Sequence, residues 1–468
     1  MVSPTNDRPS LLDSELARLL TRYDQQGPRY TSYPTAPTWS NEFGDREHRE
    51  SLQRAAEAPG EGLAMYVHVP FCRSMCFYCG CSVIVSKDQP KADRYVDEVL
   101  LEARIAREAL PATRPVVQHH WGGGTPTFLE PAQLERLFRG LAELFPLTDD
   151  AEISIEVDPR VTTREQLQVL RACGFNRISM GVQDFDADVQ EAIHRVQSFP
   201  LTRDLVDTAR QLGFGSVNLD LVYGLPHQNP ESFQNSIDLV LAMKPDRLAC
   251  YGYAHVPWLK KHQRVIDENA LPKGAAKLEL YLTALHALRD AGYVAIGMDH
   301  FALPDDGLVR AAESGRLHRN FMGYTTAPAE DMLSFGVTAI SELAGAFAQN
   351  KKPLNEYRSD VAAGRLPVER GLRRSADDEA RRRVILDLMC RFRLRWDDHG
   401  GREHFARTYA TALQKLPPMA ADGLCTIDDD GIRVTALGRM FVRNLAMAFD
   451  AYLERQQQGT QPMFSRTV

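Results

Sequence analysis

The stretch His68-Val-Pro-Phe-Cys-Arg-Ser-Met-Cys-Phe-Tyr-Cys-Gly-Cys81 carries four of the eight cysteines of this 468-residue chain within ten residues. An apolar run, residues 63–69, leads into it and predicts a buried strand. Thiol side chains that crowd onto one loop at the end of a strand are suited to bind a metal centre. We therefore expect the rest of the chain to support this loop.

The region that follows alternates between apolar runs and amphipathic helices. Strands are predicted at 63–69, 116–121, 152–157, 177–180, 217–222, 247–253 and 293–296. Gly174, Gly213 and Gly292 are each placed to end a helix before the next strand, so the unit repeats weakly. Such alternation predicts parallel strands joined by right-handed crossovers. With about six units we expect an α/β fold, a partial (β/α)6 TIM-like barrel, with its chemistry at the carboxyl ends of the strands.

Two further regions flank the predicted barrel. Residues 27–35 cannot form a regular helix because Pro28 and Pro34 interrupt them, so we expect an extended N-terminal arm. Beyond residue 365, helical patterns and a hairpin with an Asp-Gly turn predict a small, mainly helical, winged-helix-like C-terminal domain. The expected organisation is an arm and lead-in (1–60), the barrel (61–350) and the C-terminal domain (365–468).

Several helices are predicted from spacing and capping signals. A short helix is expected around 12–23 and a longer one over 91–110. Thr162 and Glu165 form a capping-box pattern that predicts a helix start. Thr435 is expected to cap a helix that runs to about Leu453.

The composition is that of an ordinary globular protein, with 44% apolar and 25% charged residues. A net charge of −7 gives no general attraction to nucleic acid or to an anionic membrane, and we expect neither as a partner. The first 22 residues lack the apolar core of a secretory signal, so a cytoplasmic protein with reduced thiols is expected. The scattered cysteines, Cys173, Cys250, Cys390 and Cys425, are interpreted as small buried hydrophobes.

The spacing Cys72-x3-Cys76-x2-Cys79 is the strongest motif in the sequence. Three cysteines on a short loop can hold three irons of a cubane and leave the fourth iron open. The alternative is a structural zinc site that also uses Cys81, although zinc sites usually pair their cysteines as two distant knuckles. A ferredoxin-type carrier would require a ligand cysteine before a proline, and no cysteine here precedes a proline.

This spacing, with an aromatic residue before the last cysteine, resembles the signature of radical S-adenosylmethionine enzymes. Other stretches are similar to the oxygen-independent coproporphyrinogen III oxidase family, and the resemblance runs from the arm to the last residues. The matching stretches are Gly-Pro-Arg-Tyr-Thr-Ser-Tyr-Pro-Thr (27–35), Tyr-Val-His-Val-Pro-Phe-Cys (66–72), Cys-Gly-Cys (79–81), His-Trp-Gly-Gly-Gly-Thr-Pro-Thr (120–127), Gly-Met-Asp-His-Phe-Ala (297–302), Leu-His-Arg-Asn-Phe (317–321) and Phe-Ser-Arg (464–466).

The resemblance implies a [4Fe-4S] cluster on Cys72, Cys76 and Cys79, with S-adenosylmethionine on the open iron. The family pocket can hold a second S-adenosylmethionine, and Gln183, Arg195 and Asp220 map to that site. Any one mapped residue, taken alone, is better explained by packing or by a surface ion pair; it is the set that matches the family. The full mapped set of cofactor contacts is Tyr66, Tyr78, Gly123, Gly124, Thr125, Glu156, Gln183, Arg195, Asp220, Ala254 and Ile340.

The implied reaction is oxidative decarboxylation of two propionates of coproporphyrinogen III to vinyl groups. It gives protoporphyrinogen IX in haem biosynthesis and uses two S-adenosylmethionines per full turnover. An electron donor and a final electron acceptor are required, and the sequence identifies neither. A monomer is expected. Two alternatives stay open, a haem-binding chaperone of the same family without decarboxylase activity and a zinc-bearing interaction protein.

Four further residues are candidates for contact with the substrate or the reaction. Because the chain is acidic, the four propionates must meet local cations, and Arg29 and Arg319 are the candidates, with structural salt bridges as the alternative. The arm is expected to close over the porphyrinogen. Cys81 is expected either to handle a proton or electron near the substrate or to be a packed thiol. His68 is expected to be either a functional donor near the cluster or a structural histidine at a strand end, with its hydrogen bonds made within the protein.

Overall fold

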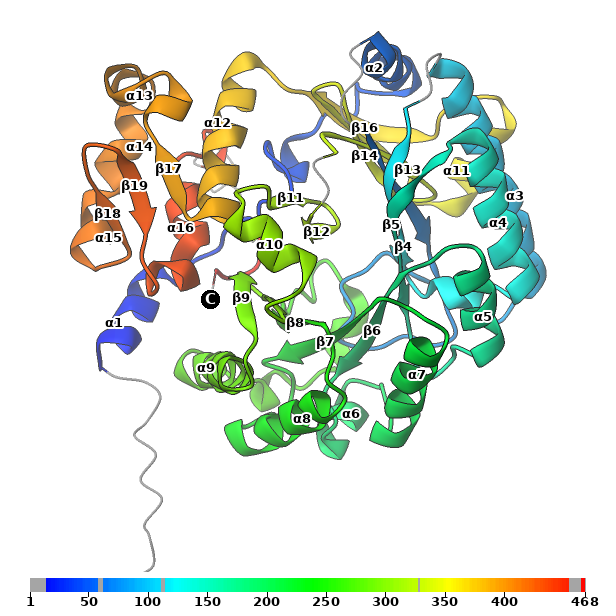
Figure 1. The fold of residues 1–468 in the computed structure, drawn as a ribbon, viewed down its shortest axis with the longest axis horizontal. Coiled ribbons are helices and arrows are strands. Elements are labelled where there is room, and N and C mark those ends of the chain that lie inside the picture. Colours follow the sequence, from blue (N-terminus) through cyan, green and yellow to red (C-terminus); the bar gives the residue numbers. More distant parts are fainter. Residues whose placement is uncertain (1–13, 58–61, 111–113, 327–328, 454–463, 468) are drawn as a thin grey trace, which may run out of the picture.

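The computed structural model describes residues 14–57, 62–110, 114–326, 329–453 and 464–467. Its centre is a curved twelve-stranded sheet, and helices cover the outer face of this sheet (Figure 1). The strands follow the order β16-β15-β14-β13-β1-β4-β5-β6-β7-β8-β10-β9. Within the described residues, no helix combines the length and the apolar character that crossing a membrane requires.

Six strands of the expected barrel are confirmed, and each pairs in parallel with the next along the chain. They are β1 (Leu63–Val69), β4 (Val116–Gly123), β5 (Leu147–Val157), β6 (Arg177–Gln183), β7 (Ser216–Tyr223) and β8 (Arg247–Gly252). Six of the seven residues of β1 are buried, as expected for a strand in a parallel sheet that is covered by helices. The carboxyl ends of these strands define the site.

Helices connect these strands, one more helix (α9, Ala275–Asp290) follows β8, and all pack on the outside of the sheet (Figure 1). They are α3 (Gln89–Ala109), α4 (Pro131–Leu144), α5 (Arg164–Ala172), α6 (Ala187–Ala192), α7 (Phe199–Gln211), α8 (Pro230–Ala242) and α9 (Ala275–Asp290). Gly174, Gly213 and Gly292 end three of them with φ of 99°, 88° and 88°, which confirms the repeated left-handed stop.

The start of α5 differs by one residue from the predicted capping box. Thr163 is the N-cap, and its side chain accepts a hydrogen bond from the backbone of Gln166. Thr162 is unavailable as a cap because its hydroxyl donates to the carbonyl of Asp158, at 2.8 Å, in the preceding turn. The helix was therefore predicted correctly, but its cap was not.

The strand expected at 293–296 is present as β9 (Val294–Gly297), but it is not the next parallel strand of the barrel. The chain turns back at Met298, whose φ is 43°, and forms β10 (His300–Ala302). Strand β10 pairs antiparallel with both β8 and β9, so it separates them. A hairpin therefore ends the sheet at this edge, which the helix-to-strand pattern alone did not predict.

The opposite edge of the sheet was not predicted either. Strand β13 (Asp331–Phe335) pairs in parallel with β1, and the chain then continues as an antiparallel meander. The meander consists of β14 (Ile340–Leu343), β15 (Ala346–Asn350) and β16 (Val368–Arg373). Helix α2 (Asp45–Glu57) packs against β14 and β15, and α11 (Leu354–Ala362) packs against α3. The short strands β2 (Phe71–Cys72), β3 (Ile84–Val85), β11 (His318–Asn320) and β12 (Gly323–Thr325) and helix α10 (Gly307–Glu313) lie outside the large sheet.

The C-terminal region has the predicted combination of helices and a hairpin. Strands β17 (Arg393–Arg395), β18 (Cys425–Ile427) and β19 (Gly431–Val434) form a small antiparallel sheet. The helices are α12 (Ala376–Leu386), α13 (Arg402–Thr408), α14 (Ala410–Lys415), α15 (Pro417–Ala421) and α16 (Val442–Met447). Figure 1 shows this region beside the barrel rather than over its outer helices.

The helix after Thr435 is shorter than predicted. The Thr435 hydroxyl does accept a hydrogen bond from the backbone of Gly438, but a 3₁₀ turn follows and α16 ends at Met447. The Asp450 side chain accepts hydrogen bonds from the backbone N–H groups of Tyr452 and Leu453. Because a continuing helix would use these N–H groups itself, this capture turns the chain before Leu453.

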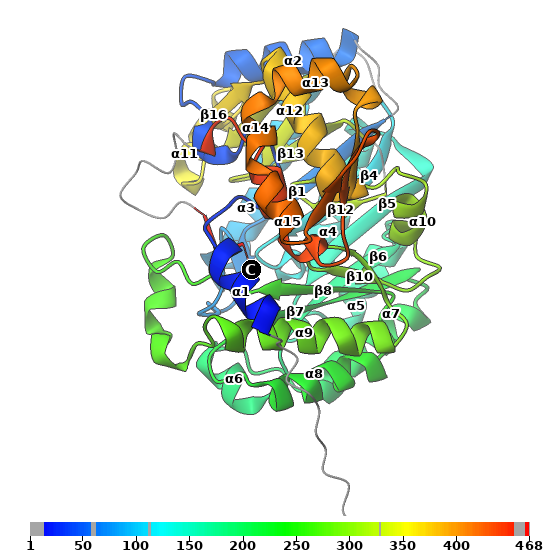
Figure 2. The ribbon, with the colours of Figure 1, turned by 90° about the vertical axis from the view of Figure 1, so that its left-hand side faces the viewer.

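The N-terminal arm is extended, as expected, and is packed between other parts of the chain. Helix α1 (Ser14–Tyr23) precedes it, and the predicted start of this helix at 12–13 lies outside the described residues. Gln26 forms an antiparallel bridge with Arg466, so the two ends of the chain lie side by side (Figure 2). Tyr30 and Tyr33 of the arm are each only 2% exposed. The arm is therefore part of the folded core.

Candidate active site

The cysteine loop begins at the carboxyl end of β1, where the sequence predicted it. Cys72 ends β2, which pairs in parallel with β3, and this pairing closes the base of the loop. The backbone N–H of Phe77 donates to the carbonyl of Ile193, at 2.9 Å. A turn follows, in which the N–H of Cys79 donates to the carbonyl of Cys76, at 3.2 Å. The loop is therefore held by backbone contacts.

Two arginines and a threonine contact the thiols. Arg160 Nη2 lies 3.5 Å and Arg195 Nη1 lies 3.8 Å from Cys76 Sγ. Cys72 Sγ lies 3.6 Å from the hydroxyl of Thr125. Guanidinium groups stabilise thiolates, which are the ligand form of cysteine. This chemistry fits an anionic thiolate-ligated cluster.

Cys79 and Cys81 have different surroundings although they are two residues apart. A hydrogen bond from Cys81 and the nearby Lys260 lower the pKa of the Cys79 thiol to about 6, against the effect of burial. The same hydrogen bond and burial raise the pKa of Cys81. Cys81 is exposed in the described structure. The fold therefore favours Cys79 over Cys81 as a thiolate ligand.

The thiols do not converge on one ion. Across the described ranges, no three His, Cys, Asp or Glu side chains are grouped as a site for a single metal ion. Three thiols, one of them beside two guanidinium groups, are a donor set that fits an iron–sulfur cluster, in which each cysteine binds a different iron.

The glycine turn after β4 lies directly against the base of the cysteine loop. A Cβ atom on Gly124 would meet the carbonyl oxygens of Pro70 and Phe71 at 2.6 and 2.7 Å. Gly123 has φ of +115°, and a Cβ there would meet the His68 ring at 2.8 Å. The backbone N–H of Gly124 donates to the carbonyl of Val69, at 2.8 Å. Only glycines permit this close approach of two chain segments.

Tyr66, His120 and Glu156 form a connected group on the inner face of three adjacent strands. The rings of Tyr66 and His120 stack with centroids 5.9 Å apart. His120 Nε2 lies 3.4 Å from Glu156 Oε1, and the N–H of Gly123 donates to Glu156 Oε2, at 3.3 Å. Burial raises the pKa of Glu156, but these two hydrogen bonds and the nearby rings of His120 and His68 together outweigh it, and the net pKa is lowered. Glu156 is 48% exposed, so an ionised carboxylate faces the open interior.

His68 links this group to the cysteine loop. Its Nδ1 lies 3.1 Å from the Tyr66 hydroxyl, and its Nε2 lies 3.0 Å from the carbonyl of Ser82. Burial lowers the pKa of His68, so the ring is neutral near pH 7. Both ring nitrogens are therefore used in the described structure to position Tyr66 and the end of the loop.

Arg195 joins the cysteine loop to the ends of β5 and β6. Besides Cys76, it contacts Asp158 Oδ2 at 3.2 Å and donates to the carbonyl of Gly181 at 2.8 Å. Burial lowers its pKa, but Tyr78, Asp158 and Cys76 outweigh this and raise it. Gln183, with φ of 71°, lies beside it, since a Cβ on Gly181 would meet both side chains. Arg195 and Gln183 are thus placed together, as the mapping requires.

Asp220 lies on the inner face of β7, opposite Gly181 in the pairing of β6 and β7. Its two oxygens accept hydrogen bonds from Asn218, at 2.7 Å, and Ser179, at 3.3 Å. Burial and the negative charge of Glu156 raise the pKa of Asp220 to about 7. Raised carboxylate pKa values of this kind are typical of functional sites.

The last mapped residues are joined to the site through side-chain bridges. Gln263 Nε2 donates to the carbonyls of both Tyr78, at 3.0 Å, and Ala254, at 3.3 Å. Ile340 begins β14, and its carbonyl accepts a hydrogen bond from Ser334, which pairs with Tyr66 in the sheet. The structure therefore brings the mapped set together along the carboxyl ends of neighbouring strands.

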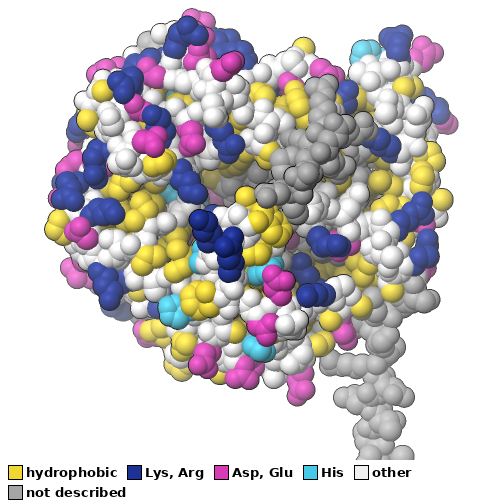
Figure 3. Space-filling view, turned by 180° about the vertical axis from the view of Figure 1, so that it is seen from behind, with side chains coloured by type: hydrophobic (Ala, Val, Ile, Leu, Met, Phe, Trp, Pro, Cys, Tyr) yellow, Lys and Arg dark blue, Asp and Glu magenta, His cyan; other side chains and the backbone are white. Residues whose placement is uncertain are grey.

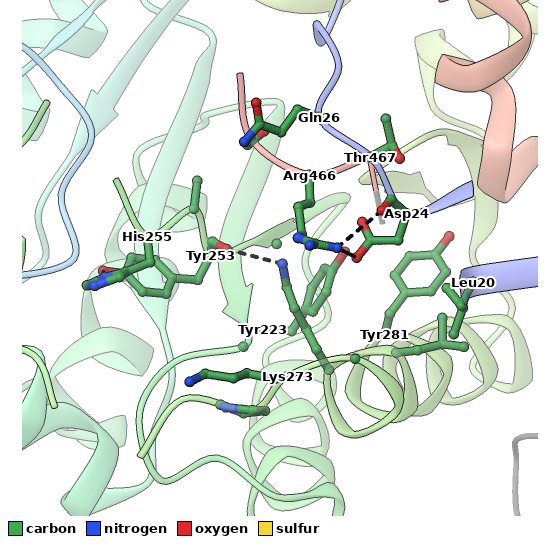
Figure 4. A pocket seen from close by; sticks show the side chains of 18 of the residues that line it. Leu20, Asp24, Gln26, Tyr223, Tyr253, His255, Lys273, Tyr281, Arg466 and Thr467 are labelled. Atoms are coloured by element: carbon green, nitrogen blue, oxygen red, sulfur yellow. Dashed lines mark hydrogen bonds and ion pairs between the residues drawn. The ribbon is translucent and has the colours of Figure 1, made fainter. Parts of the chain in front are cut away.

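A cavity of about 780 Å³ adjoins this site between the ends of β7 and β8, the start of α9, the arm and the C-terminal residues. Figure 4 shows Tyr223, Tyr253 and Lys273 on one side of it and Asp24, Arg466 and Thr467 on the other. Ala254 and Arg29 also line it. The cavity is therefore bounded by both ends of the chain and by the barrel.

Arg29 and Arg319 occupy different places. Arg29 lines the cavity and forms an ion pair with Asp299. Arg319 lies behind it, donating Nε–H to the Arg29 carbonyl at 3.3 Å, with its guanidinium over the Tyr324 ring. It is 3% exposed, and its Nη1 has no hydrogen-bond partner among the described residues. Burial and the charge of Arg319 lower the pKa of Arg29.

Sequence reasoning missed several residues of the site. Asp158 and Arg160 follow the third strand directly, a position that could have identified them. Lys277 and Arg443 line the cavity but come from a helix and from the C-terminal region, where no local motif marks them. Burial, with the nearby positive charge of Arg443, lowers the pKa of Lys277 to about 8. Burial and the charge of Arg29 lower the pKa of Arg443 to about 9.

Comparison with known proteins places the chain in a family. Residues 66–240 match the Radical SAM superfamily, and residues 375–441 match the HemN C-terminal domain. A curated protein of Escherichia coli (strain K12) named oxygen-independent coproporphyrinogen III oxidase is 46% identical over 98% of this chain and 99% of its own length. The protein of that name from Synechocystis sp. is 42% identical over 97% of this chain and 98% of its own length.

A solved structure supports the same assignment. The coproporphyrinogen III oxidase (HemN) from Escherichia coli, described as a radical SAM enzyme, superposes with a TM-score of 0.87 at 44% identity. The match covers 92% of this chain and 100% of that one. At 92% of the chain, the match extends beyond the residues 66–240 that the superfamily model covers. The chain belongs to the oxygen-independent coproporphyrinogen III oxidase family of radical SAM proteins.

Proposed function

We propose that this protein is an oxidoreductase that converts coproporphyrinogen III to protoporphyrinogen IX in haem biosynthesis, by oxidative decarboxylation of two propionates. The observation that carries the proposal is the three-cysteine loop at the carboxyl end of β1, with the mapped residues gathered at the ends of the neighbouring strands. The curated relatives that share its full length carry the corresponding name.

Cys72, Cys76 and Cys79 would hold the [4Fe-4S] cluster, and the glycine turn with Tyr66 and Glu156 would hold S-adenosylmethionine. When bound, these groups supply a 5′-deoxyadenosyl radical, a chemistry that no side chain provides. Glu156 offers an ionised carboxylate to the methionyl ammonium or the ribose. Arg160 and Arg195 offset the negative charge of the thiolates. Gln183, Arg195 and Asp220 form the proposed site of a second S-adenosylmethionine.

The cavity beside the cofactor residues is the proposed place of the substrate propionates. Arg29 lines it and, in the part of the chain that the structure describes, pairs with the carboxylate of Asp299 alone, so its guanidinium has donors left for a ligand. Buried Arg319 has an Nη1 without a partner in the described structure, which a propionate would satisfy. Lys277 and Arg443 add two buried cations to the same wall.

Cys81 and His68 are proposed to act next to the reacting groups. Cys81 is exposed and is not one of the three proposed ligands, so its thiol can exchange a proton or an electron with the substrate side. His68 positions Tyr66 and the loop through both ring nitrogens. Its contribution is to fix the geometry of the cofactor pocket.

The remaining features of the proposal concern the setting of the reaction. The eight cysteines of the described structure are free thiols, and a reducing compartment would keep them so. We propose a cytoplasmic monomer that receives electrons from a protein donor and passes electrons from the substrate to a separate acceptor. Neither nucleic acid nor membrane is part of the proposed activity, in keeping with the net charge of −7.

Anaerobic turnover tests the proposal. The reconstituted protein is incubated with dithionite, S-adenosylmethionine and coproporphyrinogen III, with Cys76→Ala as the inactive variant and Cys390→Ala, a buried cysteine distant from the loop in sequence, as the control. Protoporphyrinogen IX and 5′-deoxyadenosine are expected from the wild type and from the control alone. Stoichiometric haem binding without vinyl product would instead support the haem-binding chaperone.

A further inference from the structure

The walls of the large cavity carry an excess of positive charge. Among the described residues, six Lys or Arg and three Asp or Glu line the cavity, although the whole chain has a net charge of −7. On the outer surface, by contrast, basic and acidic side chains are both spread over the face in Figure 3. Each of the three carboxylates of the cavity has a side-chain partner. The pairs are Asp24 with Arg466, Asp299 with Arg29, and Glu268 with His255.

Four cations of the cavity wall remain, and two of them are poorly suited to hold a ligand in a fixed position. Arg443 already donates to three backbone carbonyls of the two chain ends. Lys273 is exposed on the loop before α9. The other two are Lys277 and Arg439, and in the part of the chain that the structure describes neither forms an ion pair. Lys277 and Arg439 are therefore the candidates for binding an anion.

Lys277 is held in place by its neighbours and keeps donors for a ligand. Its Nζ donates to the carbonyl of Tyr253 at 3.2 Å, a bond that is dashed in Figure 4, and lies 5.8 Å from the centroid of the Tyr223 ring. Its aliphatic stem passes Gly224, where a Cβ atom would meet Lys277 Cε at 3.0 Å. An ammonium group has three N–H donors, so beside this one hydrogen bond of the described structure two donors remain for a carboxylate.

Arg439 reaches the same cavity from the C-terminal region. It lies in the 3₁₀ turn Gly438–Phe441, and its guanidinium carbon is 4.4 Å from the centroid of the Phe392 ring. It also lines a second cavity, of about 250 Å³, as does Arg289 of α9. Burial and the charge of Arg289 lower the pKa of Arg439. An anion beside Arg439 would offset this repulsion between the two guanidinium groups.

The two cations stand apart from the residues mapped to the cofactors. Of the eleven residues mapped to S-adenosylmethionine, only Ala254 is among the described residues that line this cavity. A carboxylate bound to Lys277 or Arg439 therefore lies outside the set of side chains that would position the 5′-deoxyadenosyl radical. Such a carboxylate is suited to anchor the substrate rather than to react.

We propose that Lys277 and Arg439 bind the two propionates of coproporphyrinogen III that are not decarboxylated. This inference rests on the proposed function, in which two of the four propionates react and two remain. Each cation forms a charge-assisted hydrogen bond with one carboxylate. Tyr281 and Met298, which line both cavities, offer contacts to the methylene groups of a propionate. Because the product keeps both of these propionates, the same two cations hold substrate and product.

Binding of two stable porphyrins distinguishes the retained propionates from the reacting ones. Coproporphyrin III carries four propionates, whereas protoporphyrin IX carries only the two that the reaction leaves. Lys277→Met and Arg439→Met remove a charge but keep an apolar chain, so each should raise the Kd of both porphyrins by about tenfold or more. Lys277→Arg keeps the charge and should bind both within about threefold of the wild type. Quenching of porphyrin fluorescence measures the Kd on the reconstituted proteins.

Lys244→Met and Arg395→Met are the matched controls, because these exposed residues line neither cavity. Both should keep each Kd within about twofold of the wild type. A Kd that rises for coproporphyrin III alone would assign the two cations to the reacting propionates and overturn the proposal. Wild-type Kd values in Lys277→Met and Arg439→Met would overturn it too. Equally weak binding by Lys277→Arg and Lys277→Met would also contradict it, because the loss would then not be one of charge.

Turnover of the wild type keeps the two proposals separate. The reconstituted protein is incubated anaerobically with dithionite, S-adenosylmethionine and coproporphyrinogen III in parallel with the binding measurements. Vinyl product without the expected Kd changes would overturn the binding proposal alone. The expected Kd changes without vinyl product would overturn the proposed function, whereas the two cations would still bind the propionates that both porphyrins share.

Discussion

At the scale of single residues, the fold distinguishes Cys81 from the three cysteines of the ligand motif. Cys76 is buried beside two guanidinium groups, and Cys79 receives a hydrogen bond from Cys81 that lowers its pKa to about 6. Cys81 is the donor in this pair, and it is exposed. The surroundings thus support three ligands and one separate thiol.

Iron content tests this distinction. Cys81→Ala is expected to retain iron and sulfide near the wild-type level after anaerobic reconstitution, because no ligand is removed. Cys76→Ala is expected to lose most of both, because one of three ligands is removed. Iron and acid-labile sulfide are measured per chain in both variants. Equal loss in the two variants would mean that Cys81 is also a ligand.

Asp220 predicts a pH dependence of stability. Its pKa of about 7 in the folded chain is above its ordinary value of 3.8, so between these values the folded state binds more protons than the unfolded state. The contribution of Asp220 to the free energy of unfolding is fully present below about pH 4 and is lost as the pH rises through 7. The unfolding free energy should therefore fall less with rising pH in Asp220→Asn than in the wild type. The difference over this pH range should be at most on the order of 4 kcal/mol.

Urea unfolding of the apoprotein between pH 4 and 8 measures this effect. Buried Glu102, whose pKa burial raises to about 7, titrates in the same window and is present in both proteins, so the difference curve isolates Asp220. The Asn218 and Ser179 hydrogen bonds can persist with an amide at this position. Parallel curves for the two proteins would show that Asp220 is ionised throughout.

The residues recovered from the sequence were those carried by continuous motifs. Cys72, Gly124 and Glu156 each stand in a recognisable stretch beside a strand end, and the structure places them together. Arg443 and Lys277 reach the cavity only through tertiary packing. No local sequence pattern therefore distinguishes them from the Lys and Arg residues on the protein surface. The roles assigned to Arg29 and Arg319 stay predictions.

At the scale of secondary-structure elements, the β4 turn and the β1–β2 connection are fitted to each other. The N–H of Thr125 donates to the carbonyl of Phe71 at 2.9 Å, and Gly124 leaves no room for a side chain. The parallel strands and the glycine helix stops were predictable because periodicity and local conformation determine them. The β9–β10 hairpin and the β13–β16 meander were not, because short strands at a sheet edge have weak patterns and depend on partners far away in sequence.

Substitution in the glycine turn tests the fit of these elements. Gly124→Ala would place a Cβ at 2.6 Å from a backbone carbonyl, so the two segments must separate. The affinity for S-adenosylmethionine is expected to fall by about tenfold or more, equivalent to roughly 1–3 kcal/mol of strain. Gly215→Ala is the control, since its Cβ would have ordinary contact at 3.6 Å and its φ is not positive.

Equilibrium binding of S-adenosylmethionine to the reconstituted proteins measures the difference. Cluster content is determined in parallel, so that lost binding can be separated from lost iron. If Gly124→Ala binds the cofactor as tightly as Gly215→Ala does, the turn does not form the cofactor site.

At the scale of the whole molecule, both ends of the chain close the cavity. Arg443 donates to the carbonyls of Gly27 and Pro28 in the arm and to that of Arg466 near the C-terminus. Tyr30 of the arm donates to Asp450 of the C-terminal region, at 3.0 Å. The arm was recognisable as extended from its prolines, but its burial could not be inferred from its composition.

Removing the Arg443 contacts should loosen both ends together. In Arg443→Lys, the ammonium group lacks the planar, fixed donors of a guanidinium and cannot reach all three carbonyls. The unfolding free energy should therefore fall by about 2–3 kcal/mol. Hydrogen exchange should accelerate in residues 24–33 and 464–467 but not in β4. Arg433→Lys, on the exposed hairpin, is the control. Unchanged exchange in the arm would show that Arg443 does not hold it.

The transfer of hydrogen from the substrate tests the central claim most directly. Coproporphyrinogen III deuterated at the β-carbons of its propionates is incubated anaerobically with the reconstituted protein, dithionite and S-adenosylmethionine, and the 5′-deoxyadenosine is analysed by mass spectrometry. The account predicts one deuterium in each 5′-deoxyadenosine, formed together with vinyl product. Vinyl product accompanied only by unlabelled 5′-deoxyadenosine, or no vinyl product at all, would contradict it.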